Sequence, residues 1–420
     1  MISQTMNLLR SKLDRPLVAQ PFSSLSAHKS IKQHEKIGKL LGIDNPFFRS
    51  ADGLQGRKTV IDGKPVLNFA WCDYLGLSGH PDLIKAAKDA IDEFGTSISA
   101  SRMVSGDTQL HRDLEREIAQ TIGTDGALCF VSGHAANVST IGTLMDSDDL
   151  IVHDEFVHNS AVVGMRLSGA TTKTFRHNKL DALEAVLREE RAKYRNCLVV
   201  IEGLYSTEGD VPDLARVIEL KERYGCWLMV DDAHGCGVLG RTGAGLAEHC
   251  GIPGNKVDIW MGTLSKAYAS CGGYIAGNTE LIDTLRYSAP GFVFSVGLPP
   301  AMTASALAAL RVIKREPERV ARLHQNGAFF LKEAHALGLD TGRAVGIGML
   351  PIMVGATTRG AKAVTRVFER GINTSLIMYP GVPLNAARLR FFLTSEVTEE
   401  EIKLALQIVR EEIAKWLTGT

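Results

Sequence analysis

The chain has 420 residues, of which 45% are hydrophobic and 22% charged, an ordinary composition for a soluble globular protein long enough to form two domains. Lys and Arg together number 47, as do Asp and Glu, so nothing indicates a nucleic-acid or acidic-membrane partner, since both need clustered positive charge. No apolar run reaches the roughly 18 residues of a membrane span, residues 1–30 carry no signal-peptide pattern, and the seven scattered cysteines indicate reduced thiols and a cytoplasmic location.

The first predicted elements lie before residue 70. Residues 1–55 form a polar, weakly patterned extension, in which SIKQHEKIGKLLGI predicts one amphipathic helix. Two short β-type runs then flank Asp62 and Gly63, a pair that predicts a tight hairpin.

From about residue 80, helical periodicity alternates with short apolar runs. Continuous apolar runs between amphipathic helices are typical of the buried strands of a mostly parallel sheet. Functional residues are then expected at the carboxyl ends of the strands. We predict helices over residues 81–94, 108–121, 181–194 and 213–224, and strands in GALCFVSG, DLIVHDEF, NCLVVIEG, GCWLMVDDAHG, VDIWMGTLSK and GGYIAG.

The remainder of the chain predicts a smaller unit. An Ala-rich helical stretch follows residue 300, and the strand-like runs IGMLPIMVG and ARLRFFLTS then alternate with helices. We therefore predict an α/β protein in three parts. These are an N-terminal extension (residues 1–55), a large domain (56–300) with a mostly parallel central sheet flanked by helices, and a small α+β C-terminal domain (301–420).

Lys266 is the first candidate for chemistry. It follows an apolar strand and lies in a turn of small residues with Thr263 and Ser265. A lysine that forms a Schiff base needs a desolvated position that lowers its pKa towards neutrality, and a strand end supplies one. The Thr263 hydroxyl is close enough in sequence to reach a phosphate nearby. Taken alone, Lys266 is more simply interpreted as a surface lysine.

Asp231 and His234 follow another buried run. A carboxylate at the end of a buried strand is costly unless it meets a cation, and a pyridinium nitrogen would be such a cation. His234 is then placed to bond a cofactor or a substrate. A capping aspartate with a structural histidine is the plain alternative. Asp231, Asp232 and His234 as metal ligands are a second one, which no HExxH or Cys/His spacing supports.

The segment from Gly235 to Gly240 matches GxGxxG and follows a strand. A dinucleotide site requires such glycines to open a helix near the first strand, with an acidic residue about 20 positions later. The loop-like run RTGAG follows instead, so the sequence argues against a nicotinamide oxidoreductase.

A third strand end carries small residues. Ser132, Gly133 and His134 open a helical run, and their N–H groups are predicted to bind an anion such as phosphate. His158 lies in a strand-to-helix loop, where its flat ring could stack on a cofactor. A structural histidine is the simpler interpretation of His158 alone.

In this order, these motifs resemble the fold-type-I pyridoxal-phosphate (PLP) enzymes. More specifically, the chain resembles the α-oxoamine synthase family, which includes 2-amino-3-ketobutyrate ligase, 8-amino-7-oxononanoate synthase, 5-aminolevulinate synthase and serine palmitoyltransferase. The resemblance covers roughly residues 55–415. Its most specific segments are VDDAHGCGVLGRTGAG and GTLSK, and SGHAANV, VIEGLYSTEGDVPDL, FVFSVGLPP and ARLRFFLTSEVTEEEI also match.

The resemblance implies a role for each candidate residue. Lys266 would carry PLP and later act as a base, Asp231 would pair with the ring nitrogen, His234 with the ring oxygen, and His158 would stack on the ring. Arg390 would bind the carboxylate of the amino acid, a task that suits a bidentate guanidinium. The cofactor would also be bound by Ser132, Gly133, His134, Glu202, Ser206, Thr263, Ser265 and, from the partner subunit of a homodimer with shared active sites, Ser295; Asp73 and Ser101 would lie near the substrate.

The implied reaction is the decarboxylative condensation of a small L-amino acid with an acyl thioester to give an α-amino ketone. Glycine, alanine and serine all remain candidates, as do coenzyme A and a carrier protein for the acyl group. Asp73 stands where the family commonly has Asn, and His134 where it has Phe or Tyr. The alternatives are another PLP reaction, such as transamination or lysis, and a non-catalytic subunit, although such subunits lack the lysine that Lys266 supplies.

Overall fold

The computed structural model describes residues 19–415. The chain divides into two units, Met1–Phe48 and Arg49–Thr420. The described part of the first unit contains a short 3-10 turn (Phe22–Ser24) and the helix α2 (Ser26–Leu40), which confirms the helix expected in SIKQHEKIGKLLGI. The start of the predicted extension, residues 1–18, lies outside the described residues.

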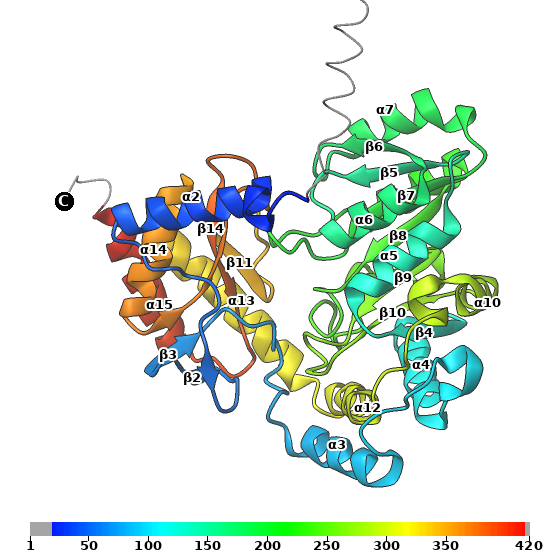
Figure 1. The fold of residues 1–420 in the computed structure, drawn as a ribbon, viewed down its shortest axis with the longest axis horizontal. Coiled ribbons are helices and arrows are strands. Elements are labelled where there is room, and N and C mark those ends of the chain that lie inside the picture. The colour runs from blue at the N-terminus through cyan, green and yellow to red at the C-terminus, as the bar shows by residue number, and fades with distance from the viewer. Residues whose placement is uncertain (1–18, 416–420) are drawn as a thin grey trace, which may run out of the picture. The chain divides into compact units, whose positions relative to one another are not determined.

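A seven-stranded sheet forms the centre of the second unit, with the order β4-β10-β9-β8-β7-β5-β6 (Figure 1). Among these strands β10 alone runs antiparallel to its neighbours, so the predicted mostly parallel sheet is confirmed. The strands are β4 (Gly126–Phe130), β5 (Leu150–Asp154), β6 (Thr171–Phe175), β7 (Cys197–Glu202), β8 (Trp227–Asp231), β9 (Ile259–Thr263) and β10 (Gly273–Gly277).

Both faces of this sheet are covered, which explains the continuous apolar runs. In β4, Cys129 belongs to one core and its neighbours Leu128 and Phe130 belong to the other. The predicted helices are all present, with ends shifted by a few residues. One core is shared with α3 (Pro81–Phe94), α4 (Gln109–Ile122), α7 (Leu180–Glu190), α8 (Leu214–Tyr224) and α12 (Pro300–Arg315), the other with α5 (Gly133–Leu144), α6 (Asn159–Ser168) and α10 (Thr279–Ser288).

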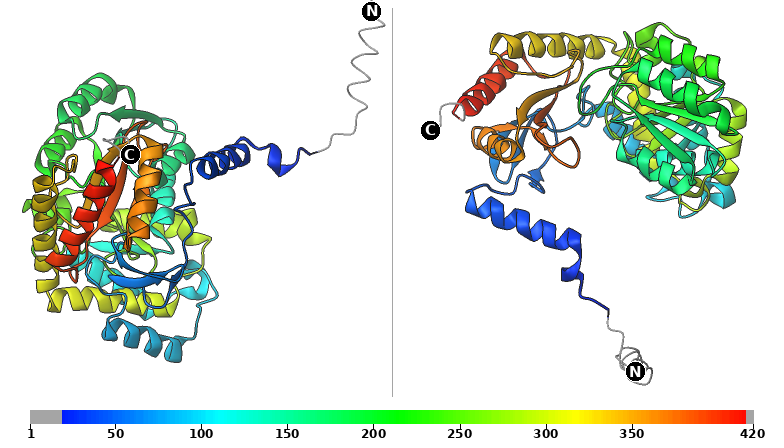
Figure 2. Two further views of the ribbon diagram at one scale, coloured as in Figure 1. Left: turned by 90° about the vertical axis from the view of Figure 1, so that its left-hand side faces the viewer. Right: turned by 90° about the horizontal axis from the view of Figure 1, so that it is seen from above.

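The C-terminal part has its own antiparallel sheet, with the order β11-β14-β13. Helices α14 (Thr357–Glu369) and α15 (Glu399–Ala414) lie side by side against it, as the left view of Figure 2 shows. The predicted small α+β domain is therefore present. Its other elements are α13 (Glu318–Ala336), β11 (Met349–Gly355), β13 (Ser375–Ile377) and β14 (Ala387–Phe392).

The predicted hairpin around Asp62 and Gly63 is also confirmed, as β2 (Lys58–Ile61) and β3 (Lys64–Asn68). With β1 (Ala51–Asp52) and β12 (Ile372–Asn373) these strands make a four-stranded sheet, in which β3 pairs with β12 in parallel. The hairpin thus pairs with a strand from the C-terminal part of the chain, and the domain boundaries at residues 56 and 301 stay a prediction from the sequence. Within residues 19–415, no helix combines the length and apolarity needed to cross a membrane.

Candidate active site

Three candidate residues meet at one edge of the central sheet. Glu202 ends β7, Asp231 ends β8 directly opposite it, and Lys266 follows the end of β9. Parallel strands bring their carboxyl ends to the same edge, so residues distant in sequence become neighbours there. The cluster therefore lies where the strand pattern predicted it.

The carboxylate of Asp231 is buried and held by two donors. Its Oδ1 accepts from Ala233 N at 3.1 Å, and its Oδ2 accepts from Asn137 Nδ2 at 2.7 Å. The same amide group donates to Ser160 Oγ at 2.8 Å, and Ser160 Oγ lies 2.7 Å from Nδ1 of His158. A buried hydrogen-bonded chain therefore connects Asp231 to His158. Sequence reasoning missed Asn137 and Ser160. These residues lie on α5 and α6, and they connect Asp231 and His158 only once the two helices are packed together.

Glu202 keeps one oxygen without a partner. Its Oε2 accepts from Ser206 N at 3.1 Å, whereas its buried Oε1 has no hydrogen bond in the part of the chain that the structure describes. Burial, and then the nearby Asp231 carboxylate, raise the pKa of Glu202 to about 8. Glu202 is therefore protonated at neutral pH and offers a hydrogen-bond donor to the site.

Lys266 is half-buried, and burial lowers the pKa of its ammonium group, while Cys72, Asp231 and Glu202 oppose that shift. Among residues 19–415 its Nζ makes no hydrogen bond or ion pair. A lysine with a lowered pKa and a free amine is suited to nucleophilic attack on a carbonyl group. Cys72, which sequence reasoning did not place in the site, lies within electrostatic range of both Lys266 and Arg390, and burial raises the pKa of its thiol.

His234 is buried between two aromatic side chains. Its Nδ1 lies 2.7 Å from the Tyr74 hydroxyl, and its ring stacks on Phe392 at 6.1 Å between centroids. Burial, and then the positive charges of Lys266 and Arg390, hold the pKa of His234 well below its usual range. The ring is therefore neutral at physiological pH, and Tyr74 is a further residue of the site that the sequence did not reveal.

The N-terminus of α5 lies beside the end of β9. Ser132 caps the helix by accepting from Ala135 N at 3.0 Å. A Cβ added at Gly133 would lie 3.0 Å from the Met261 side chain and 3.3 Å from Thr263 Oγ1, so the helix end packs tightly against β9. The N–H groups of Gly133 and His134 form no hydrogen bond within the described residues. A helix end with free N–H groups is suited to bind an anion.

Two further hydroxyl groups border this helix end. Thr263 Oγ1 lies 2.8 Å from Ser265 Oγ and donates to Gly272 O at 3.1 Å. The Thr263 side chain is buried, and Ser265 is exposed. The predicted pair of hydroxyls therefore lies next to the predicted anion site.

Arg390 reaches the cluster from β14. Its Nη1 donates to Ser206 O at 2.9 Å, its Nε donates to Ser375 Oγ at 3.3 Å, and its guanidinium lies over the Phe392 ring at 4.6 Å. Burial lowers the pKa of Arg390, and Cys72, Tyr74 and Glu202 act against that shift. No carboxylate pairs with this half-buried guanidinium within the described residues, so it is available to an anionic substrate.

Three predicted site residues make their bonds elsewhere. Both carboxylate oxygens of Asp73 accept from backbone N–H groups, those of Leu77 and Ser78, at 2.8 and 3.1 Å. Ser101 Oγ donates to Val293 O at 2.7 Å, and Ser295 Oγ donates to Val296 O at 3.3 Å. Within the described residues none of the three bonds to the cluster around Lys266.

The GxGxxG segment forms turns and does not open a helix. A Cβ at Gly235 would collide with the Asp232 carboxyl group, and one at Gly240 with Glu248, so the glycines permit close packing. Asp232 accepts from Leu246 N at 2.9 Å. No group of three His, Cys, Asp or Glu side chains in residues 19–415 is arranged to hold a metal ion.

The groups present at this edge match the parts of PLP. A helix end with free N–H groups suits a phosphate, a buried carboxylate suits a pyridinium, and an amine with a lowered pKa suits an aldehyde. The buried Oε1 of Glu202, which has no partner in the described part of the chain, shows that the site has a polar atom available to a bound group. Fold and site together define a PLP-dependent transferase of fold type I.

Comparison with known proteins gives the family. The family model for aminotransferase class I and II matches residues 64–409. The chain is 40% identical to 8-amino-7-oxononanoate synthase of Fervidobacterium nodosum over 86% of this chain and 91% of that one. It is 42% identical to a putative 8-amino-7-oxononanoate synthase of Gloeobacter violaceus over 82% of this chain and 88% of that one. The structure of serine palmitoyltransferase from Sphingomonas wittichii matches with a TM-score of 0.89 at 27% identity, covering 95% and 99% of the two chains.

The chain belongs to the aminotransferase class I and II family and, within it, to the α-oxoamine synthases. The resemblance stated from the motifs, the PLP cofactor and the acyltransferase class of enzyme are thereby confirmed.

Proposed function

We propose that this enzyme condenses a small L-amino acid with an acyl thioester, with loss of CO2 and of the thiol, to give an α-amino ketone. The observation that carries the proposal is the meeting of Asp231, Glu202 and Lys266 at adjacent strand ends, with Arg390 within electrostatic range. When bound, PLP supplies an electron sink that stabilises a carbanion at the Cα of the amino acid.

Each residue of the site has a separate role in this reaction. Arg390 binds the carboxylate of the amino acid, and the neutral ring of His234 bonds an oxygen of the cofactor or the substrate. Lys266 would hold the cofactor, and its Nζ would also be the base that takes the Cα proton, a role that a lowered pKa favours. Asp231, held by Asn137, would pair with the ring nitrogen of the cofactor. The positioning of Cα–H relative to the ring is a proximity effect.

The remaining candidates frame the cofactor. Gly133 and His134 bind the phosphate through their N–H groups, Ser132 fixes the start of that helix, and Thr263 and Ser265 add hydroxyl groups. His158 stacks on the ring. Glu202 donates from its protonated carboxyl group, and Ser206 fixes Glu202. Asp73 and Ser101 lie on the substrate side of the site. Asp73 caps the turn that follows it, and Ser101 anchors its loop to Val293. The free cysteines fit the cytoplasmic location proposed for the enzyme.

A spectroscopic and a product assay together test the function. Purified wild type incubated with PLP is expected to show a visible absorption band, and Lys266→Ala to lose it. Lys256→Ala, which changes an exposed lysine, is the control. Wild type given an amino acid and an acyl thioester is expected to release CO2 and free thiol in equal amounts. Transfer of the amino group without CO2 would identify an aminotransferase instead. Turnover is then compared with the same acyl group carried on coenzyme A and on a carrier protein, which identifies the acyl donor.

We further propose that two copies of the chain form a homodimer with shared active sites. Ser295 belongs to the site by family pattern, yet it does not bond to the Lys266 cluster of its own chain. Ser295 lies in a segment next to residues 101–105. Ser101 joins the two segments, because its hydroxyl donates to Val293 O and its backbone forms a β-bridge with Val296. Apolar side chains stand exposed on both segments, namely Met103 (49%), Val104 (82%), Phe294 (87%) and Val296 (45%), and Tyr287 (68%) is exposed on α10.

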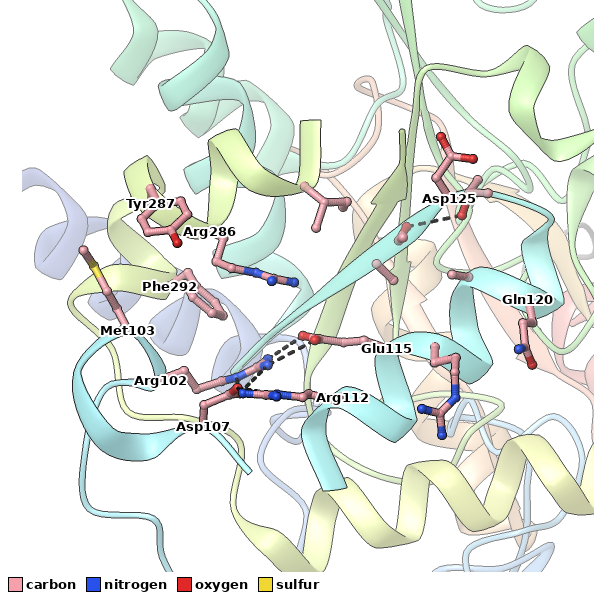
Figure 3. A pocket seen from close by; sticks show the side chains of 16 residues that line it. Arg102, Met103, Asp107, Arg112, Glu115, Gln120, Asp125, Arg286, Tyr287 and Phe292 are labelled. Carbon is pink, nitrogen blue, oxygen red and sulfur yellow. Dashed lines mark hydrogen bonds and ion pairs between the residues drawn. The ribbon is translucent and has the colours of Figure 1, made fainter. Parts of the chain in front are cut away.

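A cavity of about 690 Å³ adjoins this surface, and Met103 and Tyr287 are among its lining residues (Figure 3). Light scattering tests the proposal. Wild type is expected to have twice the mass of the chain, and Phe294→Asp to be monomeric and inactive. Leu404→Asp, on an exposed apolar residue of α15, serves as the control. A fully active wild-type monomer would refute the shared site.

A further inference from the structure

His177 lies in a buried cluster that the reaction proposed above does not use. It follows β6, and its two ring nitrogens face two carboxylates. Nδ1 lies 3.0 Å from Asp154 Oδ1, and Nε2 lies 3.0 Å from Asp210 Oδ2. The exposed fractions of the residues His177, Asp154 and Asp210 are 2%, 0% and 7%. Asp154 ends β5 and Asp210 lies in the loop after β7, so one ring joins three neighbouring segments of the same sheet edge.

The ring of His177 is charged. Each of its nitrogens has a carboxylate oxygen opposite, so each carries a proton. Burial acts to lower the pKa of His177, but its hydrogen bonds to Asp154 and Asp210 outweigh burial and raise the pKa to about 9. The second negative charge is offset by N–H donors. Phe156 N and Asn178 N each donate to Asp154 at 2.9 Å, and Asn178 Nδ2 donates to Asp210 at 2.9 Å.

The first segment that His177 holds leads to His158. The Phe156 ring lies 4.8 Å from the His177 ring, and Glu155 Oε1 accepts from His177 N at 2.8 Å. Two residues after Phe156, His158 caps α6 and bonds to Ser160. The position of the ring-stacking histidine is therefore set a few residues from this ion cluster.

The second segment leads to Arg390. The Tyr205 ring lies edge-on to His177 at 4.4 Å, and Tyr205 N donates to Asp210 O at 3.0 Å. The next residue, Ser206, accepts through its carbonyl from Arg390 Nη1 at 2.9 Å. The loop thus passes from the ion cluster directly to the guanidinium that binds the substrate carboxylate.

We infer that His177 is a positioning residue that fixes the loop of Ser206 and Arg390 relative to the loop of His158. This inference rests on the function proposed for Arg390 and His158. The imidazolium clamps Asp154 and Asp210 together, and a neutral side chain with one good hydrogen bond leaves the two loops free to separate. A shift of the guanidinium relative to the cofactor ring weakens amino-acid binding more than cofactor binding, because the phosphate end of the cofactor is held by α5 and β9.

The test compares His177→Gln with wild type in the PLP-loaded full-length enzyme. The dissociation constant of the amino acid, read from the change in the visible band, is expected to rise between about 10- and 100-fold, the usual effect of a misplaced binding group. PLP retention is expected to stay within about threefold. His153→Gln is the matched control, because His153 also bridges β5 and β6, through Thr174, without touching Asp210.

A pH series separates positioning from a general loss of stability. The difference between the amino-acid dissociation constants of wild type and His177→Gln is expected to disappear as pH rises through about 9, since the wild-type ring loses its charge there. The ratio of the two dissociation constants is used at each pH, because the titration of the amino acid itself affects both equally and cancels. Should His177→Gln fail to fold, Asn178→Ala, which keeps the imidazolium and removes one bond to Asp210, is expected to give a smaller rise in the same constant.

Unchanged amino-acid affinity in variants that only melt earlier would overturn the inference. A ratio of dissociation constants that stays unchanged above pH 9 would also overturn the inference. Failure of the underlying function would appear separately, as wild type that forms no visible band with PLP.

Discussion

The hydroxyl of Tyr74 lies 2.7 Å from Nδ1 of His234, with both side chains buried. Burial raises the pKa of Tyr74 and lowers that of His234, so the phenol keeps its proton and the ring is neutral. When the phenol donates to Nδ1, the imidazole proton stays on Nε2, which is then free to donate to a cofactor or substrate oxygen. Tyr74 thereby selects the tautomer of a residue 160 positions away in sequence.

Removing this hydroxyl is expected to affect turnover more than binding. In Tyr74→Phe the tautomer of His234 is no longer fixed, and kcat is expected to fall about tenfold, as when a supporting partner of a functional histidine is removed. The amino-acid KM is expected to change little. Steady-state kinetics of Tyr74→Phe beside Tyr194→Phe measure both constants. Equal kcat values in the two variants would contradict this assignment.

Asn137 holds Asp231 in place, so its loss should weaken cofactor binding. Asn137→Ala leaves Asp231 Oδ2 without its donor, at a cost of about 1–3 kcal/mol, and PLP affinity is expected to fall at least tenfold in an equilibrium titration. Thr140→Val is the control on the same helix, because Thr140 Oγ1 has no hydrogen-bond partner in the described residues. Comparable losses in both variants would point to damage of α5 and not to Asp231.

Arg390→Lys tests recognition of the substrate carboxylate. The change keeps the charge and loses the planar fork and its contact with Phe392, so the amino-acid KM is expected to rise by about two orders of magnitude, with a smaller change in kcat. Kinetics with saturating thioester measure both constants. Arg366→Lys, on an exposed arginine of α14, is the control. A KM near the wild-type value would exclude Arg390 as the carboxylate ligand.

Glu202 makes the stability of the cofactor-free protein depend on pH. Its folded pKa of about 8 lies above the ordinary value of 4.5. The stability contributed by the protonated group is therefore fully present below pH 4.5, and it declines as pH rises through about 8. Relative to wild type, Glu202→Gln is expected to gain about 1 kcal/mol or more in unfolding free energy at pH 8–9 and nothing near pH 4.5. Urea titrations at the two pH values measure this, with Glu222→Gln as an exposed control. A gain that is equal at both values would contradict the assignment.

Much of the fold could be predicted because its strands are local patterns. The runs that became β4, β5, β7, β8, β9 and β10 are apolar on both faces, and a sheet covered by helices on both sides requires that. β6 escaped prediction because its residues alternate between half-buried and exposed at the edge of the sheet. The pairing of β3 with β12 could not be predicted, because no short segment encodes a partner 305 residues away.

The sequence by itself determined which residues are the candidates for chemistry, because Lys266, Asp231, His234 and the Gly133 loop all follow local strand patterns. The tertiary structure alone decided what surrounds them. Tyr74, Asn137, Ser160 and Cys72 come from separate elements and look like ordinary polar residues in sequence, and Asp73 proved to cap its own turn. The physical reason is range. Strand ends follow from neighbouring residues, whereas the tautomer of an imidazole or the protonation of a buried carboxyl depends on atoms that only the folded chain brings within 3 Å.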